Sequence, residues 1–471
     1  MTELHELTAL EQAEAVRRGE TDPVEIVRHH LERAGRLGPR YGAFVTVTAE
    51  RALRQAADAR RRLATGTPAS PLLGSVTAIK DLTPTADAPT SFGSRVFAHH
   101  LPAEDAHTVT LLRRAGTVSI GKTNTPEFGL CCYTDNDLVG PARNPWNPEL
   151  TAGGSSGGAA VAVALGLVAF AHASDGGGSI RIPASACGLF GIKPSRGRVS
   201  GGPTAHDITG LAVQGPLART VRDAAAALDV LARPMPGELP CVPPLPPGET
   251  YLASTARTPG RLRVARYARP AAGTEVAPEC LAAWEHAGEV LLGLGHEVED
   301  VPCPFGPEVT DLFTTVWGVK SLSHAVAPAD EEKLRPVTRA WREHGRTITA
   351  EQFAAALAGM ERAARQAVQA TAAYDAVLVP TLATLPRPLH HFDESGDPLT
   401  NLHRQSAFSA FTSVSNMTGQ PAVNLPLYWD ESGLPVGVSL VGRPADEATL
   451  LALSAQLEAA CPWRDRHPAD W

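Results

Sequence analysis

Two glycine-rich runs in the middle of the chain contain serines that could do chemistry. The first, GGSSGGAA at residues 153–160, is compatible with a linker, a phosphate-binding loop or a G-x-S-x-G turn with a nucleophilic Ser155 at its centre. A phosphate-binding loop needs Lys and Ser or Thr after its second glycine, where this run has alanines. An apolar segment follows the run, which disfavours a linker. A catalytic role is therefore favoured for this run over a linker or a phosphate-binding loop.

The second run, Gly176–Gly177–Gly178–Ser179, follows a stretch expected to be a buried strand. Consecutive glycines let several N–H groups point toward one spot, an arrangement that stabilises a developing oxyanion. Ser179, the last residue of the run, could place its hydroxyl beside the same spot as a nucleophile. A tight turn without catalytic function would have the same sequence, so the run alone leaves both interpretations open.

A nucleophilic serine needs a base, and Lys80 is the best candidate. It follows the apolar stretch VTAI, so burial should lower its pKa and leave a neutral amine that accepts a proton. An ordinary surface charge is the alternative interpretation. The histidines form no catalytic motif, and His172 is expected to be a core residue. The S-x-x-K match SIGK at 119–122 lacks an accompanying K-T-G and is treated as chance.

Composition disfavours several classes of function. The net charge is −8 and no basic block is present, so nucleic acid is not expected as a partner. The longest apolar run, 159–171, is too short to span a bilayer, and residues 1–40 lack the apolar core of a signal peptide. Seven scattered cysteines suit a reducing compartment, and no metal-binding motif is visible. We therefore expect a soluble cytoplasmic protein with no metal, cofactor or membrane partner.

Alternating strands and helices must position these residues. Helices are expected in the first 70 residues, and from Leu72 to about Gly202 apolar runs alternate with glycine-rich turns, as in an α/β layer. A strand over 74–81 would end at Lys80, and a strand over 167–173 would lead into the second glycine run. The proline-rich segment 234–248 is expected on the surface. Later strands are predicted over 261–267, 296–302, 376–380, 421–427 and 435–442, and helices over 350–373 and 446–460.

Taken together, these segments resemble the amidase signature family. The run GGSSGGAAVAVALGLVAFAHASDGGGSIRIPASACGLFGIKPSRGRVS, residues 153–200, is similar to that family's signature almost end to end. Further blocks match in order along nearly the whole chain: AIKDL (78–82), GKTNTPEFG (121–129), RNPWNP (143–148), YDAVLVPT (374–381), TGQPAVNLPL (418–427) and GLPVGVSLVG (433–442).

The resemblance implies a fold and an activity. The expected fold is a single large α/β/α domain around a central mixed sheet, with residues 1–70 as an N-terminal helical segment packed on the core and 71–471 as the amidase signature domain. The expected activity is hydrolysis of a linear or cyclic carboxylic amide to an acid and an amine or ammonia, with esters as side substrates.

The resemblance also implies a Ser–cisSer–Lys triad. Ser179 corresponds to the nucleophile that forms an acyl-enzyme, Ser155 to the bridging serine after a cis Gly154–Ser155 peptide, and Lys80 to the base. The oxyanion hole would consist of the backbone amides of Gly176, Gly177, Gly178 and Ser179.

Fewer features define the substrate site. We predict that segments 310–325, 381–395 and 405–416 shape it, with Phe411 as one wall. Where this chain has Gly176, many relatives have Thr or Ile, and the DGGGSIR version is similar to that of bacterial amidases such as 6-aminohexanoate cyclic-dimer hydrolase. The expected substrate-binding or supporting residues are Gly129, Cys131, Cys132, Ser156 and Trp317.

Three alternatives stay open at this point. One is the glutaminase subunit of a tRNA-dependent amidotransferase, which shares the signature but works in a complex. Another is a catalytically silent binding protein on the same fold. The third is an α/β-hydrolase in which Ser155 is the nucleophile and a histidine is essential. For a free-standing amidase, a small-molecule amide substrate and a homodimer are the expected partners.

Overall fold

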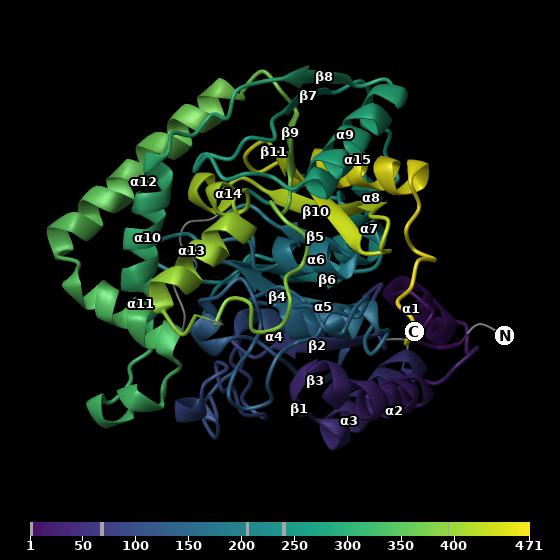
Figure 1. Ribbon diagram of the computed structural model, residues 1–471. Helices are drawn as coiled ribbons and strands as arrows, with labels where there is room; N and C mark the ends of the chain where they lie inside the picture. Colours follow the sequence, from purple (N-terminus) through teal and green to yellow (C-terminus); the bar gives the residue numbers. More distant parts are fainter. Residues whose placement is uncertain (1–2, 66–69, 204–206, 238–241, 394) are drawn as a thin grey trace.

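The computed structural model describes residues 3–65, 70–203, 207–237, 242–393 and 395–471 (Figure 1). Parts of three predicted segments lie outside these ranges: residues 1–2 and 66–69 of the N-terminal segment, 238–241 of the proline-rich segment, and residue 394 of segment 381–395. The described residues of the proline-rich segment are exposed or half-buried. No described helix is both long and apolar enough to cross a membrane.

Strands and helices alternate through most of the chain. The strands are β1 Phe44–Val47, β2 Val76–Lys80, β3 Val118–Thr123, β4 Phe170–Asp175, β5 Phe190–Lys193, β6 Val213–Ala218, β7 Arg263–Arg266, β8 Glu297–Asp300, β9 Ala376–Pro380, β10 Ala422–Trp429 and β11 Pro435–Gly442. The helices are α1 Ala9–Arg17, α2 Pro23–Tyr41, α3 Ala49–Ala64, α4 His107–Arg114, α5 Gly157–Ala164, α6 Arg181–Cys187, α7 Val221–Leu231, α8 Tyr251–Ser254, α9 Pro278–Gly293, α10 Glu308–Lys320, α11 Pro336–Thr347, α12 Ala350–Ala370, α13 Pro398–Phe408, α14 Ser413–Thr418 and α15 Glu447–Ala460.

The large sheet is mixed, as predicted. Its strand order is β4-β6-β5-β10-β11-β9-β7-β8, in which β7 runs parallel to both of its neighbours and the other pairs are antiparallel. Side chains of β4 alternate between the two faces: Phe170 joins the apolar core shared with α7, α9 and α15, whereas Ala171 and Ala173 join the core around α5 and α6. The α/β/α fold class is thereby confirmed.

A separate three-stranded sheet, which the sequence did not predict, holds Lys80. Its order is β1-β3-β2, with β2 parallel to β3. The small sheet is tied to the large one because the Ala169 N–H, just before β4, donates to the Val76 carbonyl in β2 at 3.1 Å. The beginnings of β2 and β4 thus lie together, and near their other ends Lys80 Nζ donates to the Ser174 carbonyl at 3.3 Å.

Side chains cap the first turn of several helices. Thr8 and Glu11 form a capping box at α1, as do Thr349 and Gln352 at α12. The side chain of Asp22 caps α2.

The N-terminal segment packs against the rest of the chain. The buried carboxylate of Asp223 in α7 accepts the N–H groups of Ala9 and Leu10 in α1. Both termini lie near α1 (Figure 1), where the rings of His5 and Trp471 are in contact.

Candidate active site

The site centres on Lys80, which is fully buried at the end of β2. Its Nζ lies 2.8 Å from Ser155 Oγ and 2.7 Å from Ser156 Oγ, the two serines that precede α5. It also donates to the Ser174 carbonyl in β4 at 3.3 Å. The Gly154–Ser155 peptide is cis, as the family resemblance implied.

These contacts leave the amine lone pair of Lys80 for Ser155. Burial lowers the pKa of Lys80 to about 7, despite the opposing effect of nearby Asp175. A neutral amine has two N–H groups and one lone pair. The Ser174 carbonyl can only accept, and Ser156 already donates its own proton to that carbonyl at 3.1 Å, so both accept from Lys80. The lone pair is then free to accept the proton of the Ser155 hydroxyl.

Ser179, the last residue of the second glycine run, precedes α6 and lies close to these serines. Its carbonyl accepts the Ser156 N–H at 3.2 Å, which ties the two glycine-rich loops together. Its side chain lines a cavity. Among the residues that the structure describes, no hydrogen bond joins the hydroxyls of Ser179 and Ser155.

The amides of the second glycine run are not all free, and the prediction for Gly178 needs correction. Its N–H donates to Asp175 Oδ1 at 2.7 Å, so it is not available to an oxyanion. The N–H groups of Gly176, Gly177 and Ser179 have no hydrogen-bond partner among the described residues. These three amides remain candidates for an oxyanion hole.

The cavity beside Ser179 has a volume of about 120 Å³. None of the described residues that line it carries a charged side chain. The predicted pocket residues Gly129, Cys131, Cys132 and Trp317 line it, together with Gly177. Burial raises the pKa of the Cys131 thiol to about 12, so it stays protonated and is no rival nucleophile. The cavity is suited to an uncharged, largely apolar group.

Comparisons with known proteins decide the family. The family model described as Amidase matches residues 25–451. This chain belongs to the amidase family. AmiB2 of Mycobacterium tuberculosis, named as an amidase, is 40% identical over 99% of both chains. The 6-aminohexanoate-cyclic-dimer hydrolase of Paenarthrobacter ureafaciens is 35% identical over 98% of this chain and 96% of its own.

A solved structure agrees with the sequence comparisons. A 6-aminohexanoate cyclic dimer hydrolase complexed with substrate has a TM-score of 0.89 and 30% identity, covering 100% of both chains. The protein is therefore an amide-hydrolysing enzyme, as predicted. The predicted family resemblance is also confirmed.

Two predictions about the pocket of this amidase were wrong. Phe411 is buried in a core cluster with Val379 and Ala265 and is not among the lining residues. None of the described residues of segment 381–395 lines the cavity either, whereas 310–325 and 405–416 both supply lining residues. Sequence reasoning missed seven lining residues, of which only Ile182 lies inside a quoted motif: Leu130, Ile182, Ala271, Ala272, Val309, Trp341 and Leu402.

The unusual Gly176 has a steric explanation. A Cβ at this position would lie 3.1 Å from Cη2 and 3.2 Å from Cζ3 of Trp317, closer than ordinary van der Waals contact. Phe313 stacks on Trp317 with ring centroids 5.1 Å apart, and a Cβ at Gly177 would lie 3.0 Å from its Cζ. The aromatic pair of α10 thus occupies the space that a side chain at 176 would fill.

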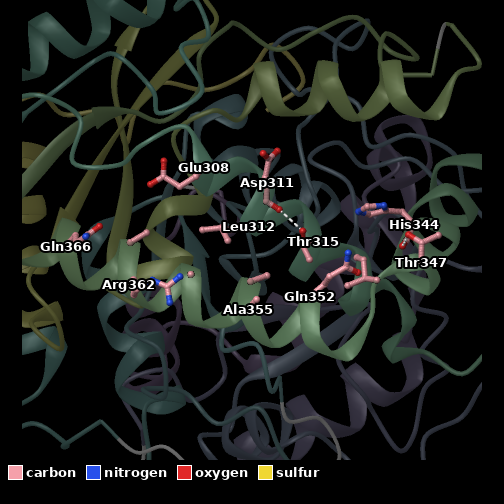
Figure 2. Close-up of a pocket in the computed structure, with 14 residues that line it drawn as sticks. Glu308, Asp311, Leu312, Thr315, His344, Thr347, Gln352, Ala355, Arg362 and Gln366 are labelled. Carbon is pink, nitrogen blue, oxygen red and sulfur yellow. Dashed lines mark hydrogen bonds between the residues drawn. The ribbon is translucent and has the colours of Figure 1, made fainter.

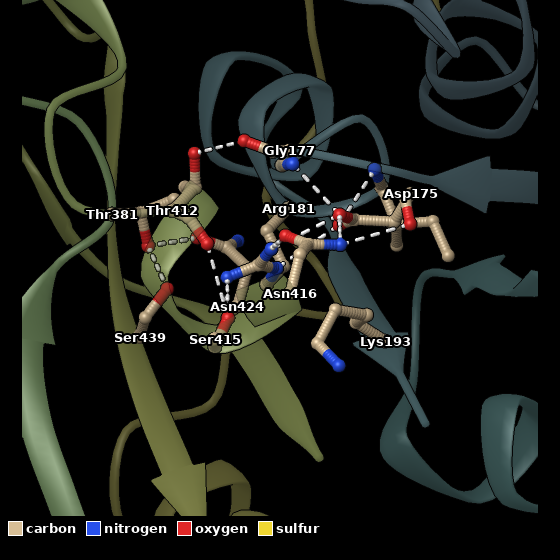
Figure 3. Close-up of polar contacts among 12 residues, drawn as sticks. Asp175, Gly177, Arg181, Lys193, Thr381, Thr412, Ser415, Asn416, Asn424 and Ser439 are labelled. Carbon is tan, nitrogen blue, oxygen red and sulfur yellow. Dashed lines mark hydrogen bonds and ion pairs between the residues drawn. The ribbon is translucent and has the colours of Figure 1, made fainter. Parts of the chain in front are cut away.

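A buried polar network of Asp175, Arg181 and Asn416 contacts the second glycine run through the Gly178 N–H (Figure 3). Burial alone would raise the pKa of Asp175, but the Arg181 guanidinium, bound through two nitrogens at 3.0 Å, holds it well below its usual range. Asn416 of α14 donates to Asp175 Oδ1 at 2.9 Å and accepts from Arg181 at 2.8 Å. Sequence reasoning did not identify this network.

A larger cavity of about 630 Å³ lies elsewhere, between α10, α11 and α12 (Figure 2). Its polar side chains include Glu308, Asp311, His344 and Arg362. None of the individually predicted site residues lines it, although Asp311, Leu312 and Thr315 belong to the predicted segment 310–325. This groove is larger, but the smaller cavity is the better candidate for the active site. Among the described lining residues, Ser179 of the smaller cavity is hydrogen-bonded to Ser156, which contacts the buried Lys80.

The remaining titratable candidates are accounted for by other contacts. Lys122 of the chance S-x-x-K match forms an ion pair with Asp81 at 3.3 Å and donates to Thr90 at 2.6 Å. His172 lies within 2.6 Å of Gln214 Oε1, as expected for a core residue. No described histidine is hydrogen-bonded to Ser155, Ser156 or Ser179, which contradicts the α/β-hydrolase alternative.

Proposed function

We propose that this amidase hydrolyses an uncharged carboxylic amide with an apolar acyl group through an acyl-enzyme on Ser179. The observation that carries the proposal is the buried Lys80, in contact with Ser155 beneath the cavity that Ser179 lines. Ser155 would relay protons between Ser179 and Lys80. The relay requires that the hydroxyl of Ser179 donate to Ser155 Oγ when the substrate is bound.

The proposed reaction is balanced over two half-reactions. The Ser179 Oγ attacks the amide carbon, its proton passes to Ser155, and the proton of Ser155 passes to the lone pair of Lys80. The amides of Gly177 and Ser179, with Gly176, would stabilise the oxyanion. When the C–N bond breaks, the leaving nitrogen takes a proton back through Ser155. Water then attacks the acyl ester by the same relay and releases the acid.

The charge-free cavity supports the substrate class. Glutamine would bring an ammonium and a carboxylate that need charged partners, and the described cavity offers none, which disfavours the glutaminase alternative. The cyclic dimer of 6-aminohexanoate, which the name of one relative specifies as its substrate, is an uncharged bis-amide and belongs to the proposed class.

A fluorophosphonate serine probe tests the proposal, with the adduct located by peptide mass spectrometry. We expect an adduct on Ser179 in the wild type. In Lys80→Ala and Ser155→Ala the rate of labelling should fall by about 100-fold or more. An adduct on Ser155 that forms independently of Lys80 would overturn the mechanism. An unlabelled wild type would favour the silent binding protein instead.

A further inference from the structure

We propose that Thr412 is a positioning residue of the oxyanion hole, an inference that rests on the proposed function. Thr412 lies between α13 and α14, outside the signature region, and its side chain is almost completely buried. Its Oγ1 donates to the Gly177 carbonyl at 2.6 Å (Figure 3). A second acceptor, the Ser409 carbonyl, is farther away at 3.3 Å.

The bond to Gly177 completes a two-point attachment of one peptide unit. The carbonyl of the Gly177–Gly178 peptide accepts from Thr412, and its N–H donates to Asp175 Oδ1 at 2.7 Å. Because a peptide is planar, fixing both ends fixes the orientation of the plane. The two peptides that flank this plane carry the free N–H groups of Gly177 and Ser179. Their directions therefore depend on both attachments.

Glycine alone would not hold this geometry. Gly178 has a φ of +130°, and the run has no side chains that could pack to restrict it. A Cβ at Gly178 would lie 2.2 Å from Thr412 Oγ1. The hydroxyl of Thr412 can therefore approach this closely only because residue 178 has no side chain. Thr412 thus supplies from outside the loop the restraint that the loop cannot supply itself.

The same turn of chain also forms part of the cavity wall. Ser409, Ala410 and Ser413 line the cavity, while Thr412 between them faces the glycine run. Ser415 and Asn416 extend the attachment, since both bind Arg181, at 2.6 Å and 2.8 Å. The wall that contacts the substrate and the loop that holds the oxyanion are therefore one connected unit.

The test compares Thr412→Val and Thr412→Ala, which remove the hydroxyl, with Thr412→Ser, which keeps it. Hexanoyl p-nitroanilide is the chromogenic substrate. Because a misplaced or missing oxyanion donor costs about 10²-fold or more, we expect kcat to fall about 30- to 100-fold in the first two variants. KM should stay within about threefold, and Thr412→Ser should keep kcat within about threefold of wild type.

Inhibitors separate positioning from folding. A hexyl trifluoromethyl ketone, which forms a tetrahedral adduct with the serine, should lose affinity in proportion to kcat in Thr412→Val. 1-Hexanol, an uncharged ligand without a carbonyl group, should bind as in the wild type. Thr315→Val is the matched control, because its hydroxyl also donates to a carbonyl, that of Asp311, but it lies in the outer groove. It should leave kcat unchanged.

The outcomes distinguish the two proposals. Unchanged kcat in Thr412→Val and Thr412→Ala, an equal loss in Thr412→Ser, or a loss confined to KM would overturn the positioning role. The alanine variant provides the same comparison if the valine variant does not fold. A wild type that is neither labelled at Ser179 nor active would instead overturn the proposed function.

Discussion

The buried Lys80 predicts a specific pH dependence for the reactivity of Ser179. Only the neutral amine can accept the relayed proton, so labelling by a fluorophosphonate should rise as pH increases through the pKa of Lys80, about 7. With the ordinary lysine pKa of 10.5, about 0.03% of the side chain would be neutral at pH 7, compared with about half in this environment. Burial thus raises the reactive fraction by about three orders of magnitude.

The size of the expected change follows from the same pKa. The neutral fraction of Lys80 is about 3% near pH 5.5 and about 90% near pH 8, so the labelling rate should increase about 30-fold between them. The assay measures the second-order rate of probe attachment to Ser179 by intact-protein mass spectrometry. Because only the first proton transfer and attack are involved, the profile is independent of product release.

The chain offers a matched control lysine. Lys193 is also fully buried with a pKa lowered to about 7 by burial, but among the described residues its Nζ is hydrogen-bonded to the Pro194 carbonyl alone and to no serine. Lys193→Met should keep the inflection near pH 7, whereas Lys80→Ala should remove it together with most of the rate. A flat profile in the wild type, or an inflection that disappears in Lys193→Met, would refute the assignment of Lys80 as the base.

Three other substitutions have predictable effects. Gly176→Thr should lower kcat/KM about 10- to 100-fold because its side chain overlaps Trp317, and a second substitution, Trp317→Leu, should restore part of it; no restoration would argue against the steric explanation. Lys193→Met should raise the free energy of unfolding at pH 7 by about 2–5 kcal/mol, measured by urea titration. The gain should vanish toward pH 10.5, because unfolded wild type then no longer holds the proton that folding removes; a constant gain would contradict this. Ser156→Ala should move the labelling inflection of Lys80 to lower pH, since it removes an acceptor that favours the charged amine, and an upward shift would refute the hydrogen-bond pattern.

The proposed catalytic residues could be singled out from sequence because each lies in a contiguous motif. Lys80 follows an apolar strand, and Ser155 and Ser179 each lie in a glycine-rich turn whose composition limits what it can do. The cis Gly154–Ser155 peptide followed from the same resemblance. The predicted strands ending at 81 and 173 correspond to β2 and β4, with β4 beginning and ending slightly later. A homodimer, a cytoplasmic location and a one-domain organisation stay predictions.

The features that were missed all depend on contacts between distant segments. The separate small sheet forms because β1 pairs with β3, and no local pattern specifies that partner. The Gly178 N–H was predicted to be free because the sequence does not show that the Asp175 carboxylate, three residues earlier, points back toward it. Arg181 and Asn416 hold the carboxylate in that position. Phe411 looked like a pocket wall because aromatic residues suit both pockets and cores, and sequence does not separate the two.

The residues that could be predicted from motifs and those that could not have different expected roles in substrate choice. The signature region contains the proposed nucleophile, relay and backbone amides, and these groups would act on the amide bond itself, which all amide substrates share. Side chains that would contact the acyl group come instead from α10, such as Trp317, and from the turn around Ser409 and Ser413. Those segments also hold the glycine run in place, through Trp317 against Gly176 and Thr412 on the Gly177 carbonyl. A substitution that reshapes the pocket is therefore expected to change kcat as well as KM, because the same residues that contact the substrate support the loop that stabilises its transition state.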